Sequence, residues 1–211
     1  MVATDPLVLK GLVEMAVNKQ APWSVRESSV NSLTSHNLPK SSQAQYVKSI
    51  ASIALEPGVN WKLRYAAVSA LSGHPQSFAL RALVSSLNDP RATPSIQKAA
   101  AEGLESAGAA GVEALTRNLR VSDEKWQVRY WSARALARQN NDFEIAKPYP
   151  QLSIVLTDTS PLVREVGASA LGNVSTLISI FANNPGDERL RVRVANRLAQ
   201  LGRGASLSAS V

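Results

Sequence analysis

The sequence predicts an all-α protein built from paired helices, and three observations support this prediction. The 211-residue chain is 45% hydrophobic with only 5% aromatic residues, and its abundant Ala, Leu, Val and Ser favour closely packed helices. One short pattern recurs along the whole chain. Breaker residues separate the apolar segments, and no stretch shows strand-type alternation of useful length.

The recurring pattern is Trp or Pro, any residue, an aliphatic residue, Arg, and Leu seven positions after the Arg. Two weaker copies occupy 94–104, where Gln97 replaces the Arg, and 188–198. Successive Arg positions lie 27 to 38 residues apart, a period typical of helix-pair repeats somewhat shorter than the usual HEAT or armadillo unit. The strong copies are WSVRESSVNSL (23–33), WKLRYAAVSAL (61–71), WQVRYWSARAL (126–136) and PLVREVGASAL (161–171).

The spacing within each copy predicts an amphipathic helix. In the second copy, Leu63, Ala67, Val68 and Leu71 fall on one face at a period of 3.6 residues. Small residues in the middle positions allow neighbouring helices to approach closely. The last apolar position is always leucine: Leu33, Leu71, Leu104, Leu136, Leu171 and Leu198.

An apolar segment precedes each copy and predicts the first helix of each pair. Pro, Asp, Ser and Thr between the segments are typical of helix starts. The sequence therefore predicts an α-solenoid of about six HEAT-like helix pairs in residues 1–203, with a flexible tail at 204–211 and the second helices lining a concave surface. The first-helix segments are 8–17, 45–55, 78–87, 111–119, 151–156 and 175–182.

Composition excludes several classes of function. The chain has no cysteine, which excludes disulfides, thiolate catalysis and Cys-based metal sites. We expect no membrane-spanning segment, no secretory signal, no metal and no intrinsic cofactor. The histidines, His36 and His74, fall in predicted loops and form no catalytic constellation. A net charge of +7 and a pI near 10.0 favour an acidic partner.

The repeated Arg and Trp residues are expected to be mainly architectural. An Arg near the start of a second helix can pair with an Asp or Asn of its own or the preceding turn and so orient successive repeats. Trp23, Trp61 and Trp126 share one repeat position and are expected to pack on the inter-helix turn. The expected partners Asn60, Asp123, Asp158 and Asp187 precede Arg64, Arg129, Arg164 and Arg191 by four or six residues.

Some aromatic and basic residues are not explained by the repeat. Tyr65 and Tyr130 follow their Arg directly, at a position that rotates away from the core, and Trp131 has no repeat counterpart. Arg134 and Arg138 lie four apart on one helix face. Planar cations beside rings suit carboxylates, conjugated ligands or stacked bases, although a solvated face is the alternative. The candidate binding residues are Trp61, Arg64, Tyr65, Trp126, Arg129, Tyr130, Trp131, Arg134 and Arg138.

The segments KWQVRYWSARALA and NWKLRYAAVSALS resemble the Trp-x-aliphatic-Arg-Tyr repeats of the E/F-type phycobilin lyase family, most of all its branch associated with phycobilisome turnover. The resemblance covers residues 23 to about 198. It implies a scaffold or chaperone that binds a phycobiliprotein subunit, or another subunit of a photosynthetic complex, and transiently an open-chain tetrapyrrole (bilin). It also implies the cyanobacterial cytoplasm or the plastid stroma.

The same resemblance bears on activity and on the binding residues. Some members attach or detach bilin at a cysteine of the partner, so any enzymatic activity would be of the bilin lyase type. Gln97 in place of Arg and Pro161 in place of Trp depart from the pattern and leave that activity open. Matched by repeat position, the resemblance implies that the partner or the bilin is bound by Trp61, Arg64, Tyr65, Trp126, Arg129 and Tyr130.

Two other functions remain open. One is a basic HEAT-like nucleic-acid-binding protein or DNA glycosylase, for which Asp123 and Glu124 near Trp126 and Trp131 would supply the acidic group among aromatic rings. The other is a structural adaptor subunit that wraps a helix or tail of a larger complex.

Overall fold

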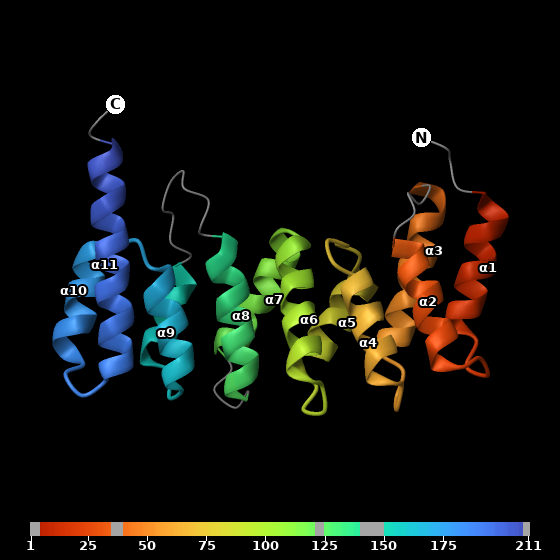
Figure 1. The fold of residues 1–211 in the computed structure, drawn as a ribbon, viewed down its shortest axis with the longest axis horizontal. Helices are drawn as coiled ribbons and strands as arrows, with labels where there is room; N and C mark the ends of the chain where they lie inside the picture. The colour runs from red at the N-terminus through yellow and green to blue at the C-terminus, as the bar shows by residue number, and fades with distance from the viewer. Residues whose placement is uncertain (1–4, 35–39, 121–124, 140–149, 209–211) are drawn as a thin grey trace. The chain divides into compact units, whose positions relative to one another are not determined.

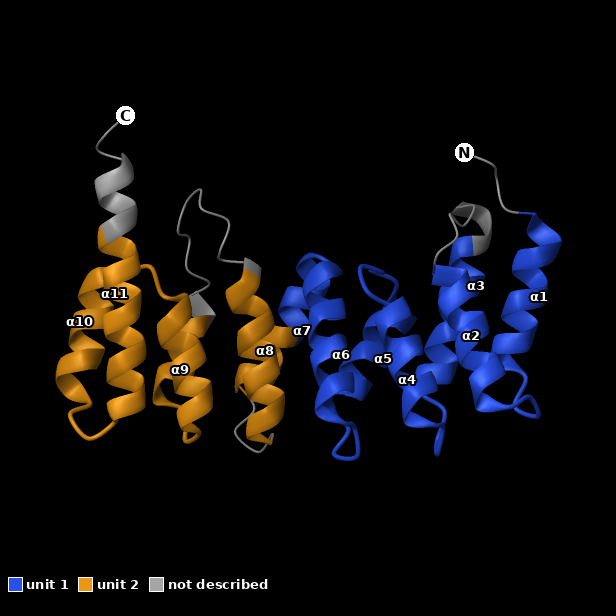
Figure 2. Cartoon of the chain, in the orientation of Figure 1, with its two compact units in different colours: residues 1–114 blue, residues 115–211 orange. Residues whose placement is uncertain are grey.

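A computed structural model describes residues 5–34, 40–120, 125–139 and 150–208, and every element in these ranges is a helix (Figure 1). The chain divides into two compact units, residues 1–114 and 115–211 (Figure 2). The predicted start of the tail at 204 falls inside the last helix, α11 (Glu188–Ser208). None of the described helices has the length and apolar character needed to cross a bilayer.

Unit 1 is a two-layered stack of helix pairs. The pairs are α1 (Pro6–Val17) with α2 (Trp23–Thr34), α3 (Lys40–Ala54) with α4 (Trp61–Ala70), and α5 (Ser77–Asn88) with α6 (Pro94–Ser106). The first helices contact one another in chain order, and so do the second helices. The predicted all-α arrangement of HEAT-like helix pairs is therefore confirmed here. Helix α7 (Ala109–Arg120) spans the boundary between the units.

Unit 2 follows the same plan with one departure. Helices α8 (Trp126–Gln139), α9 (Pro161–Ala170) and α11 pack in sequence as second helices, and α10 (Val174–Asn183) packs on α11. The first helix expected near 151–156 is a 3₁₀ helix, η1 (Pro150–Thr157), which packs mainly on α9. Its eight residues make fewer than three turns at three residues per turn.

Each second helix begins at the first residue of the repeat pattern, because local chemistry starts it there. The Asn60 side chain accepts a hydrogen bond from the Lys62 amide at 2.9 Å, and Thr93 does the same for Ile96. Pro94 and Pro161 occupy the first helical position, where no amide hydrogen is needed. The predicted helix starts are thus confirmed in both units.

The repeated leucine forms the core, as predicted, with one exception. Leu33, Leu71, Leu104 and Leu136 are fully buried. Leu198, on the terminal helix α11, is only partly buried and packs at the edge of the last core cluster. Small residues permit the close packing that was expected, since a Cβ added at Gly167 would lie 2.5 Å from the Val155 side chain.

A buried tyrosine in α3 gives a first prediction about stability. Tyr46 is 4% exposed, and within the described part of the chain its hydroxyl has no hydrogen-bond partner; burial raises its pKa to about 12. Removing the hydroxyl in Tyr46→Phe should raise the free energy of unfolding by about 1 kcal/mol, measured by urea denaturation. The matched change at the exposed Tyr65 should have no effect, and a destabilised Tyr46→Phe would show that the hydroxyl does have a partner.

Candidate functional site

Four of the repeated arginines form an arginine ladder, defined here as Arg26, Arg64, Arg129 and Arg164 with the carboxylates that they contact. Each guanidinium reaches the turn between the two helices of the following repeat. The ladder ion pairs are Arg26–Glu56 at 2.6 Å, Arg64–Asp89 at 2.5 Å, Arg129–Asp158 at 2.6 Å, and Arg164–Asp187.

The predicted pairing was right in kind but wrong in partner. Side chains at a helix start lean toward the N-terminus, so these guanidinium groups reach the turn edge of the neighbouring repeat. Asp158 was expected to pair with Arg164, but its carboxylate binds Arg129, and only its main-chain carbonyl accepts from Arg164, at 2.7 Å. Asn60 caps α4 instead, and Asp123 lies outside the described residues.

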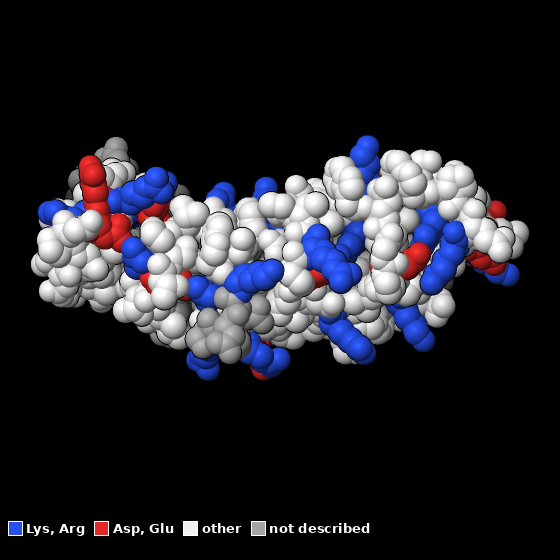
Figure 3. Space-filling view, turned by 90° about the horizontal axis from the view of Figure 1, so that it is seen from below, with Lys and Arg blue, Asp and Glu red and all other residues white. Residues whose placement is uncertain are grey.

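Two of the ladder carboxylates also accept a backbone hydrogen bond in the turn before the second helix of their own repeat. Asp89 accepts from the Arg91 amide at 2.8 Å and Asp158 from the Ser160 amide at 2.8 Å. Each of these two carboxylates therefore joins two repeats. Figure 3, seen from below, shows Lys and Arg side chains beside Asp and Glu side chains at several places on this face.

Gln97, which replaces Arg in the third copy, keeps one function of the ladder. Its side-chain amide donates to the Leu87 carbonyl at 3.3 Å, as Arg26 Nε donates to the Ala16 carbonyl at 2.9 Å, in each case ten residues back along the chain. The neutral side chain thus preserves the link to the first helix of its own pair without a buried charge.

The ladder holds its carboxylates in the charged form. A hydrogen bond from Arg26 lowers the pKa of Glu56, and one from Arg164 lowers the pKa of Asp187. For Asp89 and Asp158, burial alone would raise the pKa, but hydrogen bonds from backbone amides and from the ladder arginines outweigh it and leave the pKa lowered.

These shifts predict a loss of stability in acid. A carboxylate whose pKa is lower in the folded state contributes its full stabilisation above its unfolded pKa, roughly 4, and loses it as the pH falls through the folded value. Urea denaturation should therefore give a lower free energy of unfolding at acidic than at neutral pH. Asp187→Asn should flatten this dependence, and a variant with the unchanged slope would contradict the assignment.

The α8 cluster, defined as Trp126, Tyr130, Trp131 and Arg134, is the main assembly of candidate residues in unit 2. The Tyr130 ring meets Trp126 and Trp131 edge-on, with centroids 6.3 Å and 5.0 Å away. Arg134 donates to the Tyr130 hydroxyl at 2.8 Å and lies 5.9 Å from the centre of the Trp131 ring. The structure thus brings together four residues that the sequence singled out, on one face of one helix.

The α4 aromatic face, defined as Trp23, Lys62, Trp61 and Tyr65, is the corresponding surface of unit 1. The Lys62 ammonium lies 5.5 Å from the centre of the Trp23 ring and 5.8 Å from that of Trp61, within the range of cation–π attraction. Sequence reasoning missed Lys62 and treated Trp23 only as a turn residue. The signal was present, because Trp23 and Trp61 share one repeat position and Lys62 follows Trp61 directly.

The tryptophans of the repeat are about half exposed. Trp23, Trp61 and Trp126 were expected to pack onto the inter-helix turns, yet they are 40%, 53% and 41% exposed. Each is the first residue of its helix. A large part of each indole is therefore available to a partner.

The remaining candidate residues divide between structure and surface. Arg64 and Arg129 belong to the arginine ladder, and the Arg129 side chain is only 9% exposed. Tyr65 is 41% exposed, and Arg138 is exposed in the last turn of α8. The candidate residues of α4 and α8 belong to different units, so each set forms a surface of its own.

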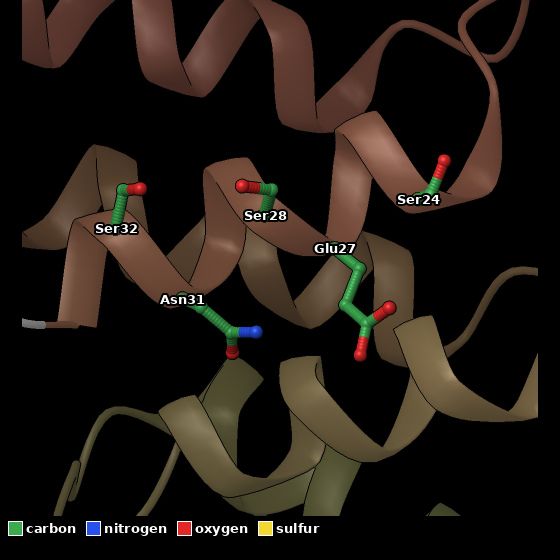
Figure 4. A pocket seen from close by; sticks show the side chains of 5 residues that line it. All are labelled: Ser24, Glu27, Ser28, Asn31 and Ser32. Atoms are coloured by element: carbon green, nitrogen blue, oxygen red, sulfur yellow. The ribbon is translucent and has the colours of Figure 1, made fainter.

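Other features of the described residues are less suited to catalysis or metal binding. A polar pocket of about 530 Å³ lies on α2, where Ser24, Ser28 and Ser32 share one side and Glu27 and Asn31 point away from them (Figure 4). His74 is half-buried, and burial lowers its pKa; His36 lies outside the described residues. The described part of the chain contains no cluster of His, Asp and Glu suited to a metal.

Comparison with known proteins gives a likeness at the level of structure and none at the level of sequence. No family model and no curated protein sequence matches the chain. Among solved structures the chain is similar to human deoxyhypusine hydroxylase in complex with glycerol, with a TM-score of 0.41 and 14% identity over 92% of this chain and 96% of that one. A likeness of this degree assigns no activity to the chain.

Proposed function

We propose that the chain is a HEAT-type protein-binding scaffold that holds an acidic partner against the aromatic and cationic side chains of its second helices. The α8 cluster is the observation that carries the proposal. It places three rings and an exposed guanidinium on one helix face, and its four side chains lie outside the arginine ladder pairs.

The residue types of the cluster support a protein partner. Trp, Tyr and Arg contribute most of the binding energy in protein interfaces because they offer large, stiff surfaces with polar ends. The net charge of +7 favours a partner of opposite sign. The α4 aromatic face repeats the same chemistry, with Lys62 as its cation.

The resemblance of the repeats to phycobilin lyases supplies the finer proposal. The partner would be a phycobiliprotein subunit, with a bilin as transient ligand, in the cyanobacterial cytoplasm or the plastid stroma. The two propionates of a bilin suit Arg134 and Arg138, and its conjugated chain suits the rings of Trp126 and Trp131. Any bond made or broken would involve a cysteine of the partner, since this chain has none.

The proposal predicts saturable binding of an isolated phycobiliprotein subunit, measured by calorimetric titration. Tyr130→Ala/Arg134→Ala should weaken this binding by at least about tenfold, because it removes a ring and a cation from the centre of the cluster. A parallel titration with phycocyanobilin should give a visible absorbance change and induced circular dichroism that the same variant loses.

Arg120→Ala is the matched control, because it removes an exposed arginine of unit 2 outside the cluster. It should bind as the unaltered chain does. Equal binding by the cluster variant and the unaltered chain would contradict the proposed site. Binding of duplex DNA that falls steeply with salt and depends on the cluster, without phycobiliprotein binding, would favour the nucleic-acid alternative.

A further inference from the structure

A groove at the turn edge of unit 1 lies beside the ladder pair Arg64–Asp89. It has a volume of about 290 Å³ and is formed by the turn before α4, the first residues of α4, and the turn between α5 and α6. Trp61 and Arg64 line it from α4, and Asp89, Arg91 and Thr93 line it from the neighbouring repeat.

Arg64 differs from the other ladder arginines in how its guanidinium is used. In Arg129 and Arg164 the edge that carries Nε and Nη2 binds the ladder carboxylate. In Arg26 the Nε atom donates to a carbonyl and the other nitrogens bind Glu56. Arg64 binds Asp89 through Nη1 alone, and within the described part of the chain its Nε has no partner.

The Nε/Nη2 edge of Arg64 therefore has N–H donors that do not bind Asp89. The same side chain lines the groove. Two parallel N–H groups on one guanidinium edge match the two oxygens of a carboxylate. The Nε atom itself is buried, and the Arg64 side chain is 16% exposed. Binding at this edge therefore requires a rotation of the guanidinium toward the groove, which a single bond to Asp89 opposes less than a bidentate pair would.

Charge and shape around the groove favour a carboxylate on a peptide. Glu56 and Asp89 are neutralised by Arg26 and Arg64, and Arg91 adds a positive charge at the lining. The half-exposed Trp61 ring offers a wall for the apolar part of a residue. In the repeat that begins at Pro161, proline stands at the position of Trp61, and the Nε/Nη2 edge of Arg164 is occupied.

We infer that this groove binds the carboxylate of an aspartate or glutamate side chain on an acidic segment of the protein partner, through the Nε/Nη2 edge of Arg64. The inference rests on the proposed scaffold function and assigns the partner a second contact, in unit 1. Arg91 supplies long-range attraction, and Trp61 holds the aliphatic part of the bound residue.

The test is an NMR titration of the full chain with a short capped alanine peptide that carries a central glutamate. The Nε–H resonance of Arg64, assigned by its absence from the Arg64→Lys spectrum, should shift with a Kd of roughly a millimolar. The resonances of Arg129 and Arg164 should stay in place, because their edges are occupied. Arg91→Gln should weaken binding about twofold to fivefold, whereas Lys10→Gln, on α1, should not change it.

Three results would overturn the inference. The same peptide with a central glutamine must fail to shift the resonance, since an equal shift would mean that the groove binds peptide carbonyls. A shift with succinate or inorganic phosphate but not with the peptide would assign the groove to a free small anion. An unmoved Arg64 resonance alongside cluster-dependent binding of the phycobiliprotein subunit would refute the groove while leaving the proposed function intact.

Discussion

Replacing Arg129 with alanine is expected to lower the free energy of unfolding by about 3 to 5 kcal/mol, because it leaves Asp158 charged and buried without its partner. Both side chains of this ladder pair are less than a tenth exposed, at 9% and 8%, and the contact is bidentate. Urea denaturation followed by circular dichroism measures the change. A loss of less than about 1 kcal/mol would place the pair among ordinary surface ion pairs.

A double-mutant cycle separates the pair from its surroundings. Asp158→Asn keeps an oxygen to accept from the Ser160 amide but removes the charge. The double variant Arg129→Met/Asp158→Asn should therefore lose less stability than the sum of the two single variants. Arg134→Ala, at an exposed position five residues after Arg129 on α8, should change the free energy of unfolding by less than about 0.5 kcal/mol. Simple additivity of the two losses would contradict a coupled pair.

Gly111→Ala is expected to be the second severe change, with a loss of more than about 3 kcal/mol. A Cβ at this position of α7 would lie 1.8 Å from the Leu104 carbonyl oxygen and 2.7 Å from its carbon. Backbone atoms cannot rotate out of the way as a side chain can, so α6 and α7 would have to separate. Thermal denaturation would report this as a large drop in Tm.

Gly11→Ala is the matched control, because Gly11 also lies inside a helix but an added Cβ would meet nothing within 4 Å. Here the substitution should stabilise α1 by up to about 1 kcal/mol through the higher helix propensity of alanine. Similar effects at Gly11 and Gly111 would show that helix propensity, and not contact between helices, decides both.

The repeat and its helix boundaries could be predicted because they follow from local chemistry. Trp61 begins its helix after the Asn60 cap, and Pro94 begins the next pattern helix after Thr93. Leu71 and Leu104 are buried because a 3.6-residue period places them on the packed face. The sequence did not predict that η1 is a 3₁₀ helix, because a short apolar segment has the same residue pattern in an α-helix and in a 3₁₀ helix.

The partners of the ladder could not be predicted from sequence distance. Arg129 and Asp158 are 29 residues apart, and only the stacking of one repeat on the next brings them together. The same holds for Lys62, which meets Trp23 from the neighbouring repeat. By contrast the α8 cluster was predictable, because residues 126, 130 and 134 are each four apart on one helix.

The most direct test of the account compares two double variants in the same pair of titrations, urea denaturation and binding of the phycobiliprotein subunit. Arg129→Met/Asp158→Asn should lower the free energy of unfolding and leave the Kd unchanged. Tyr130→Ala/Arg134→Ala should raise the Kd at least about tenfold and lower the unfolding free energy only by the loss of its ring contacts, about 1 to 2 kcal/mol. This result would assign the Arg129–Asp158 pair to architecture and the α8 cluster to binding. If the ladder variant alone lost the partner, or the cluster variant alone lost stability, the two assignments would be reversed and the account would be wrong.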